Sequence, residues 1–239
     1  MSYEYKYKIE DFYLDRGLVA NSNDLKDYLG SLPITLNPHQ KDLVVGSALG
    51  DLSIVRLGKE GRAQFKQSIK NKPYVDHMYK IIKGYVGKHP IPKLVKLKGY
   101  ETVHEQLYFH TYAHPIFSHY HRWFYRKGES GGCVKIVPQD IEDHLTPRAV
   151  AYWFMDDGSN HRPYRGGYYI HTESFSRDCI DLLVRVLRDR YNLDVKPQAV
   201  KGKHRLYISV SSINTMRELI LPYMHPSMMY KVGEEAHPS

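Results

Sequence analysis

The sequence has little cysteine and no long apolar stretch, and each absence excludes a class of protein. Its 239 residues include two cysteines, Cys133 and Cys179, without metal-ligand spacing. We therefore expect two reduced thiols rather than a disulfide-stabilised scaffold. The longest apolar stretches, residues 43–49 and 150–155, are too short to cross a membrane. The first residues, MSYEYKYKIEDFY, lack the apolar region of a secretory or import peptide, which predicts an intracellular protein.

Acidic residues are outnumbered by basic ones. The chain has 26 Asp and Glu against 34 Lys and Arg, a net charge of +8 before its 14 histidines are counted, and it has 21 tyrosines. A basic and aromatic surface is typical of proteins that bind a polyanion, so the composition favours a nucleic-acid partner. The length fits one sizeable domain or two small halves that share a core.

Two segments have the same shape, an apolar helix that ends in a carboxylate. The first runs from Asn37-Pro38 to Asp51, and the second from Thr146-Pro147 to Asp157. Each begins with a capping side chain followed by proline at the first helical position. An acid at a helix C-terminus is unfavourable because that end carries partial negative charge. Since the chain repeats this arrangement, we expect the two carboxylates to serve a metal ion.

The segments that follow these helices also repeat. In each half the pattern predicts a β-hairpin, a helix, a second hairpin, a third helix and finally a lysine beside apolar residues. The closing lysines are Lys135 and Lys231. The alternating strands have one polar face and one mostly apolar face, and the helices can cover the apolar face. We therefore predict two copies of one α+β unit.

The polar strand faces favour a groove for DNA, although ordinary solvated strand faces are the alternative. β-Ribbons fit the major groove and read base edges with such side chains. The candidate contacts are Arg62, Gln64, Lys66, Lys70, Tyr169, His171, Lys201, Lys203, Arg205 and Tyr207.

The two carboxylates suit phosphodiester hydrolysis, because Mg²⁺ prefers one or two carboxylates plus waters and phosphate oxygens. Close approach of the helices needs small residues, which Gly46 and Gly50 provide on the first helix, whereas the second offers Ala151. Asp156 is an alternative to Asp157 as the metal-binding acid. Asp157 is the better candidate because the repeat aligns it with Asp51.

Lys135 and Lys231 occupy equivalent positions and are candidates to polarise water or to stabilise developing charge. Four histidines form a second group of candidate ligands. The histidines His110, His114, His119 and His121 resemble a zinc cluster by their spacing. Because no acid or cysteine completes the set, we expect them to face DNA or the surface instead.

The two acid-ended segments resemble the paired motifs of the LAGLIDADG homing endonucleases. The nine-letter pattern falls on Val44–Leu52 (VVGSALGDL) and Val150–Gly158 (VAYWFMDDG). Both copies depart from the pattern, with Leu52 and Tyr152 where it has glycine. The likeness covers residues 37–232 and is greatest to the single-chain, two-motif, intron-encoded branch, including its yeast mitochondrial members.

This resemblance implies a fold of class α+β with duplicated αββαββα halves. Two antiparallel sheets would form a saddle over DNA, with the motif helices at the interface between the halves. The domains would be an N-terminal extension at residues 1–36, a first half at 37–139 and a second half at 140–239 with a C-terminal tail. A chain that contains both motifs would act as a monomer.

The resemblance also implies a function. Asp51 and Asp157, helped by the main-chain carbonyls of Gly50 and Asp156, would bind Mg²⁺; Mn²⁺ would substitute, and Ca²⁺ would bind without supporting cleavage. Lys135 and Lys231 would match the basic active-site residues. The reaction would be a staggered double-strand break with 3′ overhangs at a long asymmetric target, in a mitochondrion or chloroplast. Alternatives are a maturase that binds its host intron RNA and a non-catalytic DNA-binding regulator.

Overall fold

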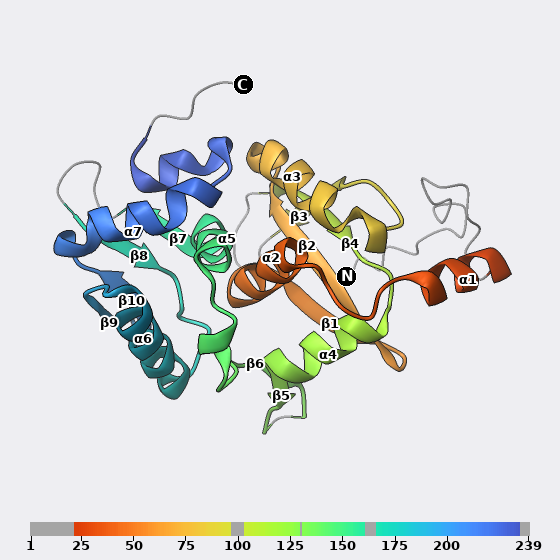
Figure 1. Cartoon of the computed structure of the whole chain (residues 1–239), viewed down its shortest axis with the longest axis horizontal. Helices are drawn as coiled ribbons and strands as arrows, with labels where there is room; N and C mark the ends of the chain where they lie inside the picture. Colours follow the sequence, from red (N-terminus) through yellow and green to blue (C-terminus); the bar gives the residue numbers. More distant parts are fainter. Residues whose placement is uncertain (1–21, 97–102, 130, 161–165, 235–239) are drawn as a thin grey trace.

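The computed structural model describes residues 22–96, 103–129, 131–160 and 166–234. It consists of two copies of one unit side by side, with helices α2 and α5 between them (Figure 1). The first half contains α2 (Pro38–Leu49), β1 (Ser53–Leu57), β2 (Glu60–Ser68), α3 (Lys72–Ile82), β3 (Ile91–Lys96), β4 (Val103–His110) and α4 (Pro115–Phe124). The second contains α5 (Pro147–Asp157), β7 (Gly158–Asn160), β8 (Tyr168–Ile170), α6 (Arg177–Tyr191), β9 (Val195–Val200), β10 (Lys203–Ile208) and α7 (Ile213–Ile220).

Shorter elements surround these two units. Helix α1 (Asn23–Ser31) precedes the first half, and the hairpin of β5 (Tyr125–Lys127) and β6 (Cys133–Lys135) joins the halves. The 3-10 helices span Ile69–Asn71, Lys83–Tyr85, Ile141–Asp143, Val210–Ser212, Leu221–Tyr223 and Pro226–Val232. Within the described ranges, no helix is both long and apolar enough to cross a membrane.

The two sheets have the same topology. The strand orders are β1-β2-β4-β3 and β7-β8-β10-β9, and every pairing is antiparallel. Helices α3 and α4 pack on the first sheet and α6 packs on the second (Figure 1). The predicted duplicated α+β fold is therefore confirmed.

Strand β2 alternates as the sequence predicts, because its side chains point in turn to the core and to solvent. Ala63 and Phe65 are buried, whereas Gln64 and Lys66 are exposed. The alternation stops at Ser68, so the prediction that Lys70 continues the strand face is wrong. Lys70 lies in the 3-10 helix that turns the chain into α3.

Helices α2 and α5 approach closely at the two glycines. A Cβ atom on Gly46 would lie 2.2 Å from the Ala149 carbonyl oxygen and 2.7 Å from the Tyr152 Cβ. One turn later, a Cβ on Gly50 would lie 2.6 Å from the Cβ of Asp156. The sequence offered Ala151 as the facing small residue, but the nearest atoms belong to Ala149 and Tyr152 instead.

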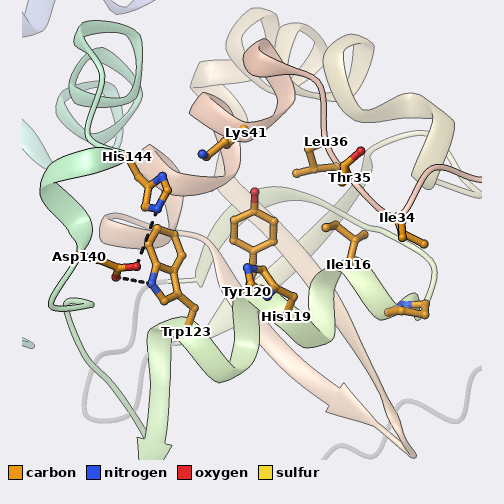
Figure 2. Close-up of a pocket in the computed structure, with 11 residues that line it drawn as sticks. Ile34, Thr35, Leu36, Lys41, Ile116, His119, Tyr120, Trp123, Asp140 and His144 are labelled. Carbon is orange, nitrogen blue, oxygen red and sulfur yellow. Dashed lines mark hydrogen bonds and ion pairs between the residues drawn. The ribbon is translucent and has the colours of Figure 1, made fainter.

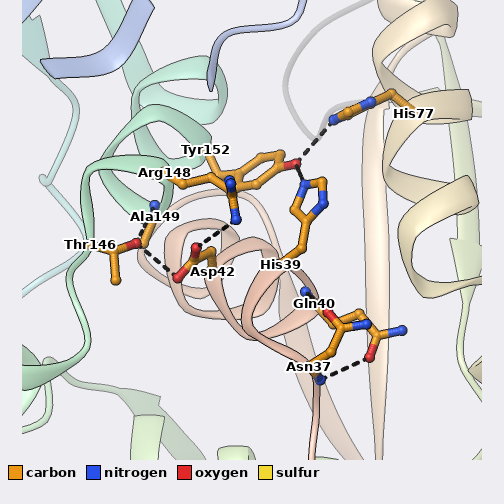
Figure 3. Close-up of polar contacts among 9 residues, drawn as sticks. All are labelled: Asn37, His39, Gln40, Asp42, His77, Thr146, Arg148, Ala149 and Tyr152. Atoms are coloured by element: carbon orange, nitrogen blue, oxygen red, sulfur yellow. Dashed lines mark hydrogen bonds and ion pairs between the residues drawn. The ribbon is translucent and has the colours of Figure 1, made fainter. Parts of the chain in front are cut away.

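Tyr152 fits beside Gly46 because its ring turns out of the seam toward two histidines (Figure 3). Its hydroxyl lies 2.8 Å from Nε2 of His39 and 3.0 Å from Nε2 of His77. His225 approaches from the second half, with its ring centroid 5.1 Å from that of His77. This tyrosine therefore replaces the glycine of the motif by carrying its bulk into a polar cluster.

The N-terminal ends of the two motif helices are joined through Asp42. Its carboxylate accepts hydrogen bonds from the Thr146 hydroxyl at 2.8 Å and from Nη1 of Arg148 at 3.4 Å (Figure 3). Thr146 also caps α5 by accepting from the Ala149 amide, and Asn37 caps α2 in a capping box with Gln40. The capping residues that the sequence identified thus fix the helix starts.

Helix α1 docks on the first half. The Tyr28 hydroxyl donates to the Gly84 carbonyl at 2.6 Å, and the Tyr85 hydroxyl donates to the Pro33 carbonyl at 2.8 Å. Both hydrogen bonds join residues 28–33 to the 3-10 helix Lys83–Tyr85, which follows α3. This part of the N-terminal extension therefore packs as part of the first half.

We predict that Gly46→Ala destabilises the protein by about 1–3 kcal/mol. A methyl group there meets a backbone oxygen, which cannot turn away as a side chain can. Gly30→Ala is the matched control, because nothing lies within 4 Å of a Cβ on that helical glycine, and we expect it to stabilise the protein by up to about 1 kcal/mol. Urea unfolding of both variants measures the difference; equal effects would contradict the close packing at Gly46.

The histidine cluster predicts a loss of stability in mild acid. Burial, with His225 and His39 nearby, lowers the pKa of His77 to about 4, against about 6.5 in an unfolded chain. Between these values the unfolded chain binds more protons, so stability is complete above pH 6.5 and falls toward pH 4. His77→Gln should reduce this loss by about 1 kcal/mol, since solvent screens a half-exposed ring. Urea unfolding at pH 7 and pH 5 compares the two proteins, and an unchanged pH dependence would contradict the role of His77.

Candidate active site

The two motif acids meet where α2 and α5 end. Asp51 follows Gly50, the residue that caps α2, and Asp157 is the last residue of α5. Both are half-buried. Burial, followed by repulsion from Asp51, raises the pKa of Asp157 to about 7, and burial raises the pKa of Asp51 as well. The two helices thus bring acids from distant parts of the chain into one electrostatic site.

Asp156 is directed into the seam and is bound by the first half. Its carboxyl accepts hydrogen bonds from Nε2 of Gln67 at 3.0 Å and from the Tyr74 hydroxyl at 3.1 Å. The Asp51 amide lies 3.4 Å from its other oxygen, the upper end of hydrogen-bond range. Burial, then repulsion from Asp51 and Asp157, raises the pKa of Asp156 to about 8. This carboxyl therefore holds the halves together, which leaves Asp157 as the acid paired with Asp51.

Gln67 links the carboxyls of the two halves. Its Nε2 donates to Oδ2 of Asp51 at 2.8 Å as well as to Asp156, and its Oε1 accepts from Nδ2 of Asn71 at 3.2 Å. We missed Gln67 and Tyr74 in the sequence. The sequence signal for Gln67 is a glutamine among apolar residues on one face of the predicted strand, and the structure shows that its side chain is buried.

Both predicted lysines reach this site. The Lys135 ammonium donates to the carbonyls of Gly50 at 2.9 Å and Leu52 at 2.8 Å, and Lys231 donates to the carbonyl of Asp156 at 2.7 Å. Burial lowers the pKa of Lys135 to about 8, although the neighbouring aspartates oppose this shift, and burial lowers the pKa of Lys231 too. Each lysine thus contacts the end of one motif helix.

The oxygen donors at the helix ends fit a hard divalent cation. Burial raises the pKa values of the Asp51 and Asp157 carboxyls, and repulsion from Asp51 adds to the rise at Asp157. A divalent cation bound between them would offset the cost of burying their negative charge. In the part of the chain that the structure describes, no three His, Cys, Asp or Glu side chains form a metal cage. Mg²⁺ does not require one, since it retains waters and binds phosphate oxygens. The carbonyls of Gly50 and Asp156 already accept from lysine, but a carbonyl oxygen has a second lone pair.

The predicted DNA contacts lie at different kinds of position. Lys66 is exposed on β2 and lies close to the acids. Its positive charge partly opposes the rise that burial causes in the pKa of Asp51. Lys201 lies in the β9–β10 turn with φ of 48°, and Lys203 begins β10. His171 follows the end of β8 and lies between Ser159, at 3.1 Å, and Glu173, at 3.2 Å.

Tyr169 and two of the histidines near α4 are buried rather than exposed. Tyr169 is buried, with the Arg205 guanidinium carbon 3.6 Å from its ring centroid. The expectation that the four histidines near α4 face DNA or solvent is wrong for His114 and His121. Both are buried: His114 caps α4, and the His121 ring stacks on that of Tyr125 at 4.9 Å.

The protein has a groove of about 760 Å³, and Figure 2 shows the residues that line it. Residues from the segment before α2, from α4 and from the segment before α5 line it. Its polar contacts include the Trp123 indole, which donates to Asp140 at 2.7 Å. Asp51, Asp156, Asp157, Lys135 and Lys231 are not among the residues that line this groove, so its size alone does not make it the catalytic centre.

Comparison with known proteins agrees with the duplicated site. Residues 41–216 match the model of the LAGLIDADG DNA endonuclease family. The chain is 30% identical to DNA endonuclease I-ChuI of Chlamydomonas applanata over 84% of this chain and 97% of the relative. It is 27% identical to cytochrome b mRNA maturase bI2 of Saccharomyces cerevisiae over 90% of this chain, and spans 51% of that relative.

A solved structure shows the same fold. The homing endonuclease I-WcaI bound to its DNA recognition sequence superposes with a TM-score of 0.82 and 28% identity, over 94% of this chain and 97% of that chain. The family match covers well over half of the sequence and includes the acid-ended part of α2 and all of α5. The chain therefore belongs to the LAGLIDADG DNA endonuclease family.

Proposed function

We propose that this protein is a monomeric, site-specific endonuclease that cuts double-stranded DNA. One observation carries the proposal: Asp51 and Asp157 share an electrostatic site with Lys135 and Lys231 at the junction of the halves. Exposed polar side chains on the strands, such as Gln64 on β2 and Gln198 on β9, suit a surface that follows a DNA groove. Endonucleases among the relatives support the same activity.

The residues divide the chemical work among them. Asp51 and Asp157 would hold divalent cations, with Gln67 orienting Asp51 through its 2.8 Å hydrogen bond. When bound, Mg²⁺ supplies charge neutralisation at the phosphate and an activated water. Lys135 and Lys231, partly desolvated at the helix ends, would donate hydrogen bonds to the reacting phosphate or orient water.

We propose that each half cuts one strand and that the product is a staggered break with 3′ overhangs, as the family resemblance implies. Mn²⁺ would substitute for Mg²⁺, and Ca²⁺ would allow binding without cleavage. The target would be long and asymmetric because the halves differ in sequence, and an organelle would be the place of action for an intron-encoded member.

Intron maturation is the second candidate function. The support is the similarity to a yeast protein named as a cytochrome b mRNA maturase. RNA binding by itself requires neither the acid pair nor the two buried lysines, and this chain has both. We therefore rank DNA cleavage first. Splicing of the host intron by an Asp51→Asn variant would separate the two activities.

Removing either acid should slow cleavage strongly without unfolding the protein. We expect Asp51→Asn and Asp157→Asn to cut a target selected from a randomised DNA library at least about 10²-fold more slowly. Calorimetric titration with Mn²⁺ should show weaker binding in both variants. Because burial raises the pKa of Asp157 to about 7, against about 3.9 in an unfolded chain, the protein loses stability as pH rises between these values. The loss is complete at pH 8, so Asp157→Asn should unfold there at an equal or higher temperature than the parent protein.

The matched control for these variants is Asp181→Asn, which removes an exposed acid on α6. It should leave cleavage and Mn²⁺ binding unchanged. If both acid-pair variants cut as fast as the parent protein, the proposed active site is wrong.

Removing either lysine should slow cleavage with little change in DNA affinity. Lys135→Met and Lys231→Met keep the side-chain length but delete the charge, so we expect a loss of about 10²–10³-fold in rate. DNA affinity measured in Ca²⁺ should change little, because these lysines contact helix-end carbonyls rather than the exposed strand faces. Lys41→Met, in the remote groove, is the control. An unchanged cleavage rate in both variants would remove the lysines from the mechanism.

A further inference from the structure

The polar face of the second sheet carries a fixed arginine. The guanidinium carbon of Arg205 lies 3.6 Å from the ring centroid of Tyr169, which is the distance of a stacked cation–π contact. On the neighbouring strand, Oε1 of Gln198 accepts from Nε of Arg205 at 3.1 Å. One contact fixes the plane of the guanidinium and the other fixes its rotation within that plane.

The base of this arrangement is rigid. Tyr169 is buried, and its ring lies 5.3 Å from that of Tyr207, over which Lys196 lies at 5.7 Å. Register places Tyr207 opposite Tyr169 and Arg205 opposite Gln198. Strand β10 lies between β8 and β9, so Arg205 is inside the sheet face and not at its edge.

Among the described residues, no acid accepts a hydrogen bond from the remaining donors of Arg205. Within the described ranges, no carboxylate forms an ion pair with Arg205, and its two Nη groups donate to no side chain. An arginine oriented at Nε and across its plane retains the two-pronged edge that pairs with O6 and N7 of guanine, the commonest specific contact in the major groove. A flexible lysine cannot supply this planar fork.

Resting on the proposed function, we propose that Arg205 reads one guanine in the half of the DNA target that the second sheet contacts, and that Tyr169 and Gln198 are positioning residues for it. Because the fork is oriented before DNA arrives, little side-chain freedom is lost on binding. A phosphate contact would not require this orientation, since phosphates carry no sequence information.

The test compares Arg205→Lys with the parent chain in a DNA-binding selection from a randomised target library in Ca²⁺. The variant keeps the positive charge, so the dependence of affinity on salt should not change. We expect guanine preference to fall at one position of the second half-site by roughly 5- to 150-fold, the loss of one bidentate contact, while other positions keep their preference.

Two further variants test the positioning residues. Gln198→Leu removes the acceptor for Nε at an exposed site, and Tyr169→Phe keeps the ring. We expect Gln198→Leu to weaken guanine preference at the same position and Tyr169→Phe to preserve it, with thermal unfolding confirming that both variants fold. Lys203→Ala is the control on the same strand and should weaken all targets alike while lowering the salt slope by about one.

The outcomes separate this inference from the proposed function. If the parent chain selects a target and Arg205→Lys retains every base preference, the inference is overturned while the endonuclease proposal stands. A uniform loss of affinity for all targets would make Arg205 a phosphate contact and would also overturn it. If the parent chain selects no DNA sequence at all, both proposals are wrong.

Discussion

The close approach of α2 and α5 is the constraint on which the rest of the structure depends. Gly46 and Gly50 have no room for a Cβ, so only glycine lets the two helix ends come together. Their meeting places Asp51 and Asp157 in one site. Acids are unfavourable at helix C-termini, but Lys135 and Lys231 donate to the terminal carbonyls and supply the positive charge that those ends favour.

The site concentrates charge that folding alone would avoid. Three carboxyls with raised pKa values surround two lysines with lowered pKa values. Gln67 and Tyr74 compensate partly by satisfying the buried Asp156 carboxyl. Such a local conflict with stability is typical of a functional site. In the free protein the carboxyls would favour binding of a divalent cation, and the two lysines would favour a phosphate.

The halves share a topology but differ in chemistry. Tyr152 replaces a motif glycine, and its hydroxyl reaches His39 and His77 in the first half. The second sheet holds a stacked Tyr169–Arg205 pair, whereas Gln64 and Lys66 are exposed on the first. Since a sheet would read DNA through its side chains and not through its topology, the unequal halves support the proposal of an asymmetric target.

The sequence by itself determined the duplicated fold and the helix starts at Pro38 and Pro147, because periodicity, capping and repetition are local or can be aligned. It also singled out Asp51, Asp157, Lys135 and Lys231, which the fold brings together and whose catalytic role stays a prediction. Only the tertiary structure decided which side chains are buried, pack together or form hydrogen bonds across the two halves. Gln67 bonds both halves, Tyr152 faces Gly46, His114 and His121 are buried, and Lys70 leaves the strand. Each of these outcomes depends on how two surfaces pack together, and packing distances between distant segments are not encoded in local spacing.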